Sequence, residues 1–166
     1  MSTSAPLILT VGVPGSGKST WAQNLVDQQA AQEKHYQIIS TDRIRAQLYG
    51  DEAIQGEWLE IRSVLMTQLK AARQSITSGN LDTVIYDATN AARRQRREFI
   101  RMARTCGYAP LIVAWMDVPL AVCLQRNAGR SRQVPPHIIE KMHRQLMGAP
   151  PTEAEDIDRI IKIKSV

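Results

Sequence analysis

The sequence predicts an α/β fold in which a parallel sheet of about five strands carries helices on both faces. Short apolar runs of strand length alternate along the chain with longer segments of helical periodicity, and this alternation is typical of parallel sheets. Hydrophobic residues make up 43% and charged residues 22%, as in ordinary globular proteins, and 166 residues suffice for one core. We therefore expect a single domain over residues 1–166.

Each expected strand is an apolar run bounded by turn-forming or acidic residues. The runs are 7–11, 36–40, 83–86, 111–116 and 159–163. The expected helices lie between them, over 18–33, from Leu48 to about Gly79, over 91–106, from after Pro119 to about Asn127, and over 136–147. In the long second helix apolar residues recur at helical spacing: Leu48, Ile54, Trp58, Ile61, Leu65 and Leu69. Gly107 stops the third helix, and Pro135–Pro136 opens the last.

The composition argues against several classes of protein. No apolar run approaches the roughly 20 residues that a membrane helix needs, and the N-terminus lacks the basic start of a signal peptide. Cys106 and Cys123 stand in apolar helical contexts and are expected to be reduced core thiols. These features predict a cytoplasmic protein without membrane contact. The net charge is +5 and 15 of the 21 basic residues are arginine, which grips phosphate bidentately, so polyanionic ligands are favoured.

The strongest motif is GVPGSGKS over residues 12–19, which fits the pattern G-x-x-x-x-G-K-[ST] in full. An expected strand precedes it and a helix follows, as a phosphate-binding P-loop requires, so a chance glycine-rich turn is the weaker interpretation. Backbone N–H groups of such a loop wrap the β-phosphate, Lys18 reaches the β- and γ-phosphates, and the Ser19 hydroxyl binds Mg²⁺. The motif predicts a P-loop NTPase fold that binds ATP and Mg²⁺. The expected nucleotide-binding residues are Gly12, Pro14, Gly15, Ser16, Gly17, Lys18, Ser19 and Thr20.

Acidic residues follow the second and third expected strands, at the sheet edge where parallel α/β sheets bind ligands. The GTPase motif N-K-x-D is absent and the chain is short for a mechanical ATPase, so we expect phosphoryl transfer to an acceptor. Asp42 can take the proton of an attacking hydroxyl, and Arg45, on the same helical face, can hold an acceptor phosphate. The alternative is that Asp42 only caps a helix beginning at Arg43. Beside a P-loop the catalytic interpretation is favoured.

The segment Asp87–Asn90 offers a second set of polar groups at this edge. Asp87 ends an apolar strand, as expected for a carboxylate that binds Mg²⁺ through water. Thr89 and Asn90 can contact the acceptor, and one of them is expected to cap the following helix.

A polar, arginine-rich stretch over 126–132 lies between two expected helices after the fourth strand. Small P-loop kinases place a lid at this position, and its arginines close over the transferred phosphoryl group. A solvated basic loop is the alternative.

Another expected helix has a strongly basic face. At helical spacing this face carries a stripe of Arg93, Arg97, Arg101 and Arg104. We interpret the stripe as a solvated face. A nucleic-acid track is the alternative, and the lack of interleaved aromatic residues argues against a stacking platform. The histidines at 35, 137 and 143 show no metal-ligand spacing.

Together these motifs resemble the 5′-hydroxyl kinase domain of bacteriophage polynucleotide kinase and its bacterial relatives over nearly the whole chain. The matching segments are GVPGSGKSTWA, the D-x-x-R of Asp42 to Arg45, VIYDATN, MDVPL and QRNAGRSRQVPP. The resemblance implies ATP-dependent phosphoryl transfer to the 5′-hydroxyl of a DNA or RNA end, with Asp42 as general base and Arg45 on an acceptor phosphate. It also implies that Arg126 and Arg130 form the lid pair and that Arg130 contacts the donor phosphates.

The resemblance leaves alternatives for the acceptor. The phage pattern D-T-N is D-A-T-N here, which shifts Asp87 by one residue relative to Thr89. Enzymes that resemble aminoacyl-tRNA kinases and sugar-nucleotide kinases share the P-loop and the acid placement, so a charged tRNA or a small molecule is an alternative acceptor. An ATP-switched binding module is the non-enzymatic alternative. The chain shows no phosphatase or ligase segment, so such a repair partner is expected to be a separate chain.

Overall fold

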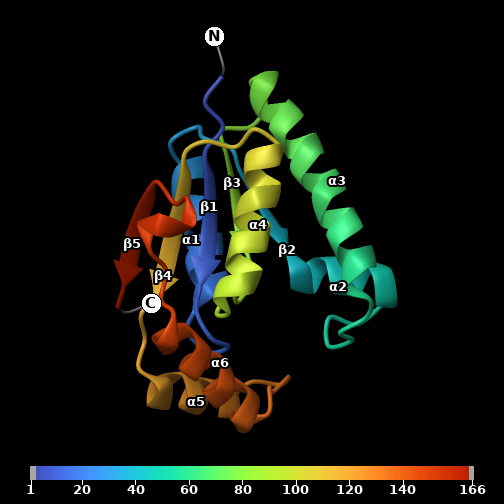
Figure 1. Ribbon diagram of the computed structural model, residues 1–166. Helices are drawn as coiled ribbons and strands as arrows, with labels where there is room; N and C mark the ends of the chain where they lie inside the picture. The colour runs from blue at the N-terminus through green and yellow to red at the C-terminus, as the bar shows by residue number, and fades with distance from the viewer. Residues whose placement is uncertain (1–2, 165–166) are drawn as a thin grey trace.

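The computed structural model, which describes residues 3–164, contains one parallel sheet of five strands in the order β2-β3-β1-β4-β5 (Figure 1). The strands are β1 (Leu7–Val11), β2 (Tyr36–Ser40), β3 (Thr83–Asp87), β4 (Leu111–Met116) and β5 (Arg159–Ile163). All four pairings between neighbours are parallel. The predicted α/β fold and its strand number are therefore confirmed, and β3 ends at Asp87, as predicted.

Helices cover both faces of this sheet, as predicted. In Figure 1, α1 lies behind the sheet, α3 and α4 lie in front, and α2, α5 and α6 gather at the lower end, where the strands terminate. The helices are α1 (Lys18–Ala30), α2 (Thr41–Tyr49), α3 (Trp58–Thr77), α4 (Arg93–Thr105), α5 (Leu120–Ala128) and α6 (Pro136–Gly148). A short 3₁₀ turn, η1 (Glu153–Glu155), precedes β5.

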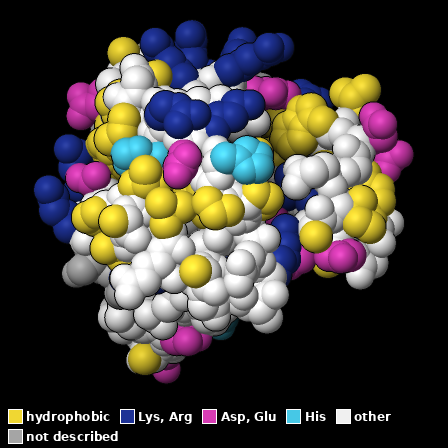
Figure 2. Space-filling model, turned by 90° about the horizontal axis from the view of Figure 1, so that it is seen from below, with side chains coloured by type: hydrophobic (Ala, Val, Ile, Leu, Met, Phe, Trp, Pro, Cys, Tyr) yellow, Lys and Arg dark blue, Asp and Glu magenta, His cyan; other side chains and the backbone are white. Residues whose placement is uncertain are grey.

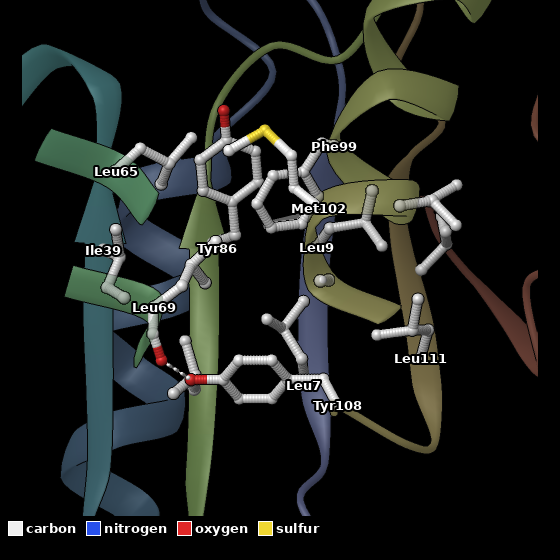
Figure 3. Packing of buried hydrophobic residues seen from close by; sticks show 14 of the residues in the cluster. Leu7, Leu9, Ile39, Leu65, Leu69, Tyr86, Phe99, Met102, Tyr108 and Leu111 are labelled. Carbon is white, nitrogen blue, oxygen red and sulfur yellow. Dashed lines mark hydrogen bonds between the residues drawn. The ribbon is translucent and has the colours of Figure 1, made fainter. Parts of the chain in front are cut away.

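The main core lies between the sheet and the pair α3 and α4 (Figure 3). Leu65 and Leu69 of α3 meet apolar side chains of the strands, and Tyr86 of β3 stacks on Phe99 of α4 with ring centroids 3.7 Å apart. The hydroxyl of Tyr108 donates to the Leu69 carbonyl at 2.7 Å, which satisfies a buried polar group. This packing fixes α4 against the strand that ends in Asp87.

A second apolar cluster on the opposite face holds the P-loop side of the molecule. Val13 of the loop and Met116 of β4 pack there with Cys123 of α5 and Ile139 of α6. Cys123 is buried and Cys106 half-buried, and both are free thiols. Burial raises the pKa of each thiol above its ordinary value.

The prediction of one long helix from Leu48 to Gly79 is wrong before Trp58. Helix α2 ends at Tyr49, Gly50 takes a left-handed φ of 77°, and α3 begins only at Trp58. Gly56, with φ 62°, lies against the Tyr49 ring, where a Cβ would come within 2.1 Å of Cε2. Two glycines in left-handed conformation thus break a periodicity that the apolar residues alone suggested.

Two arginines of α4 face inward rather than toward solvent. Arg96 is fully buried and pairs with Glu155 of η1, with Nη2 3.1 Å from Oε1. Its guanidinium also donates to the carbonyls of Asn90, Ala91 and Ala149. Removal of one partner would leave an unpaired buried charge, at a cost of about 3–5 kcal/mol.

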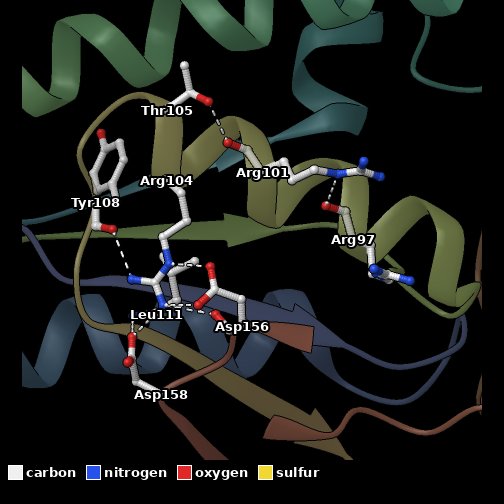
Figure 4. A network of polar contacts seen from close by, with 8 residues as sticks. All are labelled: Arg97, Arg101, Arg104, Thr105, Tyr108, Leu111, Asp156 and Asp158. Carbon is white, nitrogen blue, oxygen red and sulfur yellow. Dashed lines mark hydrogen bonds and ion pairs between the residues drawn. The ribbon is translucent and has the colours of Figure 1, made fainter. Parts of the chain in front are cut away.

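Arg104, predicted to belong to the solvated stripe, is instead three-quarters buried and paired (Figure 4). Its guanidinium reaches Asp156 at 3.0 Å and Asp158 at 2.8 Å. The Leu111 amide also donates to Asp158, and these hydrogen bonds lower the pKa of that carboxyl. The stripe prediction missed this pair because both acids come from the segment before β5, more than 50 positions away.

No helix within residues 3–164 is long and apolar enough to cross a membrane. Within the same residues, histidine, cysteine and acidic side chains form no group of three or more that could hold a metal ion.

Candidate active site

The P-loop wraps around the N-terminus of α1 at the lower edge of the sheet. Gly15 and Gly17 have left-handed φ angles of 85° and 92°, which favour glycine. A Cβ on Gly15 would lie 2.3 Å from the Cys123 carbonyl oxygen, and one on Gly12 would lie 2.5 Å from Ser16 Oγ. The glycines of the motif are therefore required by the backbone path and by close packing against α5.

Ser16 and Lys18 provide the polar groups of this loop. The buried Ser16 hydroxyl has no hydrogen-bond partner within the described chain. Lys18 Nζ donates to the Val13 carbonyl at 3.1 Å. Burial lowers the pKa of Lys18 to about 8, the negative charges of Asp87 and Asp42 oppose this shift, and the positive charge of Arg130 adds to it. A phosphate group would satisfy the hydroxyl and stabilise the ammonium.

Asp87, at the end of β3, lies against the first turn of α1. The Ser19 hydroxyl donates to Asp87 Oδ2 at 2.7 Å, and the buried Thr10 hydroxyl approaches Oδ1 at 3.4 Å. A hydroxyl and a single carboxylate beside a phosphate cradle suit Mg²⁺, which takes one or two protein oxygens and keeps several waters. The structure thus brings together the two residues that the sequence predicted near the metal. Thr10, a polar residue inside an apolar strand, was not predicted.

Thr89 and Asn90 support the P-loop from behind, and the prediction that one of them caps α4 is wrong. The Gly12 amide donates to the Thr89 carbonyl at 3.0 Å, and Asn90 Nδ2 donates to the Thr10 carbonyl at 2.8 Å. Asn90 is buried and left-handed, with φ 50°, whereas the residue preceding α4 is Ala92, which offers no capping side chain. The side-chain amide of Asn90 is therefore engaged in a hydrogen bond to the backbone of β1.

Asp42 and Arg45 lie on one face of α2 and touch each other. Arg45 Nη1 is 2.9 Å from Asp42 Oδ1, as expected for an i, i+3 pair. The N-cap of α2 is Ser40, whose hydroxyl accepts from the Arg43 amide at 3.4 Å, so the alternative that Asp42 caps this helix is wrong.

The two side chains of this pair differ in exposure. The Asp42 side chain is 54% exposed, whereas that of Arg45 is only 18% exposed, and the buried Arg45 Nε has no partner within the described residues. The accessible carboxylate of Asp42 therefore lies beside a largely buried guanidinium, that of Arg45, which has one unused N–H donor.

The expected lid residues lie on both sides of the end of α5. Arg126 Nη1 lies 3.5 Å from the Gly15 carbonyl, at the limit of a hydrogen bond. Arg130 is exposed, and its charge acts on Lys18. Asn127 pairs with the backbone of Val134 in both directions, at 2.8 and 2.9 Å, which closes the segment into a loop.

Arg132 links this loop to the other side of the site. Its Nη1 lies 2.7 Å from Glu52 Oε1, in the 50–57 connection between α2 and α3. The contact joins the segment after α5 to the part of the chain that carries Asp42. The pairing of Arg132 with Glu52 was not predicted, since a contact over 80 positions leaves no local pattern. Figure 2 views this end of the molecule, where Lys and Arg side chains gather along the upper border.

This arrangement defines the class of the protein. A strand, a glycine-rich loop and a helix that hold Lys18 at the carboxyl edge of a parallel sheet form the nucleotide site of a P-loop NTPase. The chain matches the model of the AAA_33 family, described as an AAA domain, over residues 7–149. It belongs to this family of P-loop kinases.

The curated relatives that the chain matches share less than 30% sequence identity with it. The chain is 28% identical over 137 residues to the L-seryl-tRNA(Sec) kinase of Methanococcus maripaludis, covering 82% of this chain and 51% of that protein. It is 26% identical over 163 residues to a candidate bifunctional polynucleotide kinase/RNA ligase of Autographa californica nuclear polyhedrosis virus, covering 89% of this chain and 22% of that protein. The chain thus spans about half of the first relative and about a fifth of the second.

Solved structures share the fold. Kti12 of Chaetomium thermophilum, in complex with ADP-AlF3, superposes with a TM-score of 0.67 at 15% identity, covering 96% of this chain and 89% of that one. A protein from Chloroflexus aurantiacus described as a candidate kinase gives 0.61 at 17% identity, covering 99% and 86%.

Proposed function

We propose that the protein transfers the γ-phosphoryl group of ATP to the 5′-hydroxyl of a polynucleotide end. The observation that carries this proposal is the contact between Asp42 and Arg45 at the edge that holds the P-loop. The charge of Asp42 acts on Lys18, so the carboxylate stands in the electrostatic field of the donor site. It is also exposed enough to meet an incoming hydroxyl.

In the proposed reaction Asp42 accepts the proton of the 5′-hydroxyl as its oxygen attacks the γ-phosphorus, and ADP leaves. Arg45 binds a phosphate of the acceptor through its guanidinium and thereby positions the hydroxyl for in-line attack. Lys18 stays on the donor phosphates, and Arg130 moves onto the charge that develops on the transferred group.

The residues present fit ATP and Mg²⁺. The unpartnered Ser16 hydroxyl, the glycine cradle and Lys18 suit a triphosphate, and Ser19 with Asp87 would hold Mg²⁺ beside it. The metal, when bound, would neutralise charge on the phosphate oxygens.

A charged tRNA is the second candidate acceptor. The similarity to an L-seryl-tRNA(Sec) kinase over 82% of this chain favours it. In that reaction the attacking hydroxyl would belong to an aminoacyl group at the 3′ end, so the phosphate held by Arg45 would be that of the terminal nucleotide. Both candidates place a nucleic acid at the same edge.

The experiment is transfer of labelled γ-phosphate to a panel of acceptors. We expect a 5′-hydroxyl oligonucleotide and a nucleoside 3′-monophosphate to be phosphorylated, and a bare nucleoside to be a poor acceptor because it offers Arg45 no phosphate. Equal activity on nucleosides would contradict the polynucleotide assignment. Activity on seryl-tRNA alone would establish the second candidate.

Arg45→Lys sharpens this test because the charge remains and the planar fork is lost. We expect a higher KM for the acceptor, a lower kcat/KM and an unchanged KM for ATP. Arg43→Lys, two positions earlier on the exposed side of α2, is the matched control and should leave all three unchanged.

A further inference from the structure

Four arginines of α4 point outward and have no carboxylate partner within the described chain. They are Arg93, Arg94, Arg97 and Arg101. The carboxylates behind this helix are committed elsewhere, Glu155 to Arg96 and the pair Asp156 and Asp158 to Arg104 (Figure 4). The Arg101 guanidinium donates to the Arg97 carbonyl at 3.3 Å. The outer face of α4 therefore carries a high density of uncompensated positive charge.

Two of these positive charges lie at the N-terminus of α4, where the helix dipole is also positive. The first turn of α4 contains Arg93 and Arg94 and no acidic residue. Cations at a helix N-terminus are unfavourable because the helix dipole is positive there. A bound polyanion would remove this repulsion.

Hollows on both sides of α4 give a ligand access to the arginines. Between α3 and α4 lies a cavity of about 470 Å³ whose lining includes Arg62, Arg94 and Arg101. A smaller one of about 110 Å³, on the side of η1, is lined by Arg97 and Arg101. The first cavity also contains Glu98, which Arg62 binds at 3.5 Å. The second contains Glu155 and Asp156, which pair with Arg96 and Arg104.

An aromatic side chain stands next to this basic surface. Trp58, the first residue of α3, is 41% exposed, and its indole N–H donates to Glu98 Oε1 on α4 at 3.2 Å. This contact orients the ring beside the outward arginines. Base stacking on such a ring, together with arginines for the phosphates, is the combination by which proteins bind single strands.

The N-terminus of α4 adjoins the nucleotide site. Arg96 holds the carbonyls of Asn90 and Ala91, and Asn90 in turn holds the backbone of β1 directly before the P-loop. From there Arg93, Arg97 and Arg101 follow one another at about 6 Å per step along the helix. A chain leaving the transfer site along α4 would meet one arginine at each step.

We propose that Arg93, Arg94, Arg97 and Arg101 of α4, with Arg62 and Trp58 of α3, form a track that binds the backbone and bases of a single-stranded polynucleotide beyond its reacting end. The inference rests on the proposed function and extends it, since it assigns a site for nucleotides that the Asp42–Arg45 pair cannot reach. Long acceptors then gain affinity from the track, whereas short acceptors contact only the catalytic edge.

The test compares 5′-hydroxyl oligothymidylates of about 3 and about 12 nucleotides, the latter within the range that one single-strand groove accommodates. Binding is measured by fluorescence anisotropy over a salt series, and phosphorylation is measured in parallel. For Arg97→Gln/Arg101→Gln we expect about tenfold weaker binding of the long strand. The salt slope of log K should fall by about 1.4, because each lost phosphate contact removes about 0.7 for single strands. KM for the long strand should rise, and kcat on both strands should be unchanged.

Two further sets of variants test whether the position of the charges and the aromatic ring matter. Lys34→Gln/Arg159→Gln removes the same charge from exposed residues outside the α3–α4 surface, and it should leave the preference for the long strand intact. An equal loss in this control would overturn the track in favour of general charge attraction. Trp58→Ala should weaken long-strand binding about tenfold, and Trp58→Phe should restore most of it.

The outcomes distinguish this inference from the proposed function. If the wild type binds long and short strands equally, or if the α4 variant retains wild-type affinity and salt slope, the track is wrong even when transfer occurs. If no oligonucleotide is phosphorylated while long strands bind through these arginines, the proposed acceptor is wrong and the track stands.

Discussion

In the donor site, the path of the backbone fixes the groups that would contact the phosphates. The groups expected to contact the acceptor are instead side chains on exposed elements. In the P-loop, left-handed glycines and the contact of Gly15 with Cys123 fix the path of the chain. From behind, the Thr89 carbonyl accepts from the Gly12 amide, and the Asn90 side chain donates to the Thr10 carbonyl. The donor site is therefore set by the fold itself.

The edge proposed to meet the acceptor is assembled differently. Asp42 and Arg45 project from α2, and Arg130 projects from the segment after α5. The two elements meet through the ion pair of Arg132 with Glu52. The comparison shows that backbone geometry fixes the path of the P-loop, whereas the groups proposed to meet the acceptor are side chains on α2 and on the segment after α5.

The largest expected effect comes from a substitution in the P-loop. Lys18→Ala removes the ammonium of the cradle, and we expect transfer to fall by roughly 10³-fold or more. Labelled-phosphate transfer measures the loss, and circular dichroism verifies that the fold remains. Lys141→Ala, exposed on α6, should behave as wild type. Wild-type turnover in the Lys18 variant would refute the donor assignment.

The next effect tests the acceptor edge. Asp42→Asn keeps the shape of the side chain and removes its basicity, so we expect kcat to fall by roughly 10²-fold with ATP affinity unchanged. Single-turnover transfer and calorimetric titration of ATP separate the two quantities. Asp27→Asn, on the exposed side of α1, controls for a lost charge. A parallel fall in ATP affinity would make Asp42 part of the donor site instead.

A smaller effect is expected for the segment after α5. Arg130→Ala should lower kcat by about 10- to 100-fold and leave acceptor binding nearly unchanged, because the guanidinium acts on charge that develops during transfer. Steady-state kinetics in both substrates tests this expectation against Arg144→Ala on α6. Weakened polynucleotide binding with normal kcat would place Arg130 on the acceptor path.

The smallest effect concerns pH. In the free protein burial lowers the pKa of Lys18 to about 8, and donor phosphates bind the charged form. ATP affinity should therefore be flat below about pH 7.5 and should fall above pH 8, approaching tenfold per pH unit, because binding must then add a proton. Titrations in buffers of different ionisation enthalpy measure that proton uptake. Lys18→Arg, whose guanidinium stays charged, should abolish the pH dependence.

Much of the fold and the donor site could be predicted because they leave local patterns. Strands β1, β3 and β4 contain continuous apolar runs, and the P-loop is a contiguous motif whose glycines have a backbone requirement. The same is true of the D-x-x-R spacing, since residues three apart share a helical face.

The remaining features depend on partners that are distant in sequence. The burial of Arg96 is decided by Glu155, the pairing of Arg104 by Asp156 and Asp158, and that of Arg132 by Glu52. An arginine-rich stretch looks equally basic whether its members are buried or exposed. The break between α2 and α3 was missed because two left-handed glycines outweigh an apolar periodicity.

The buried contact between Arg96 and Glu155 also constrains the order in which the chain can fold during synthesis. During synthesis the P-loop, β3 and the Asn90–Ala91 turn emerge well before the carboxylate that neutralises Arg96, which lies 59 positions further along the chain. Until that carboxylate is made, the guanidinium cannot be buried without a counter-ion. The buried support that Arg96 gives to the turn behind the P-loop is therefore complete only after Glu155 is translated, and a nascent chain that ends before Glu155 lacks it.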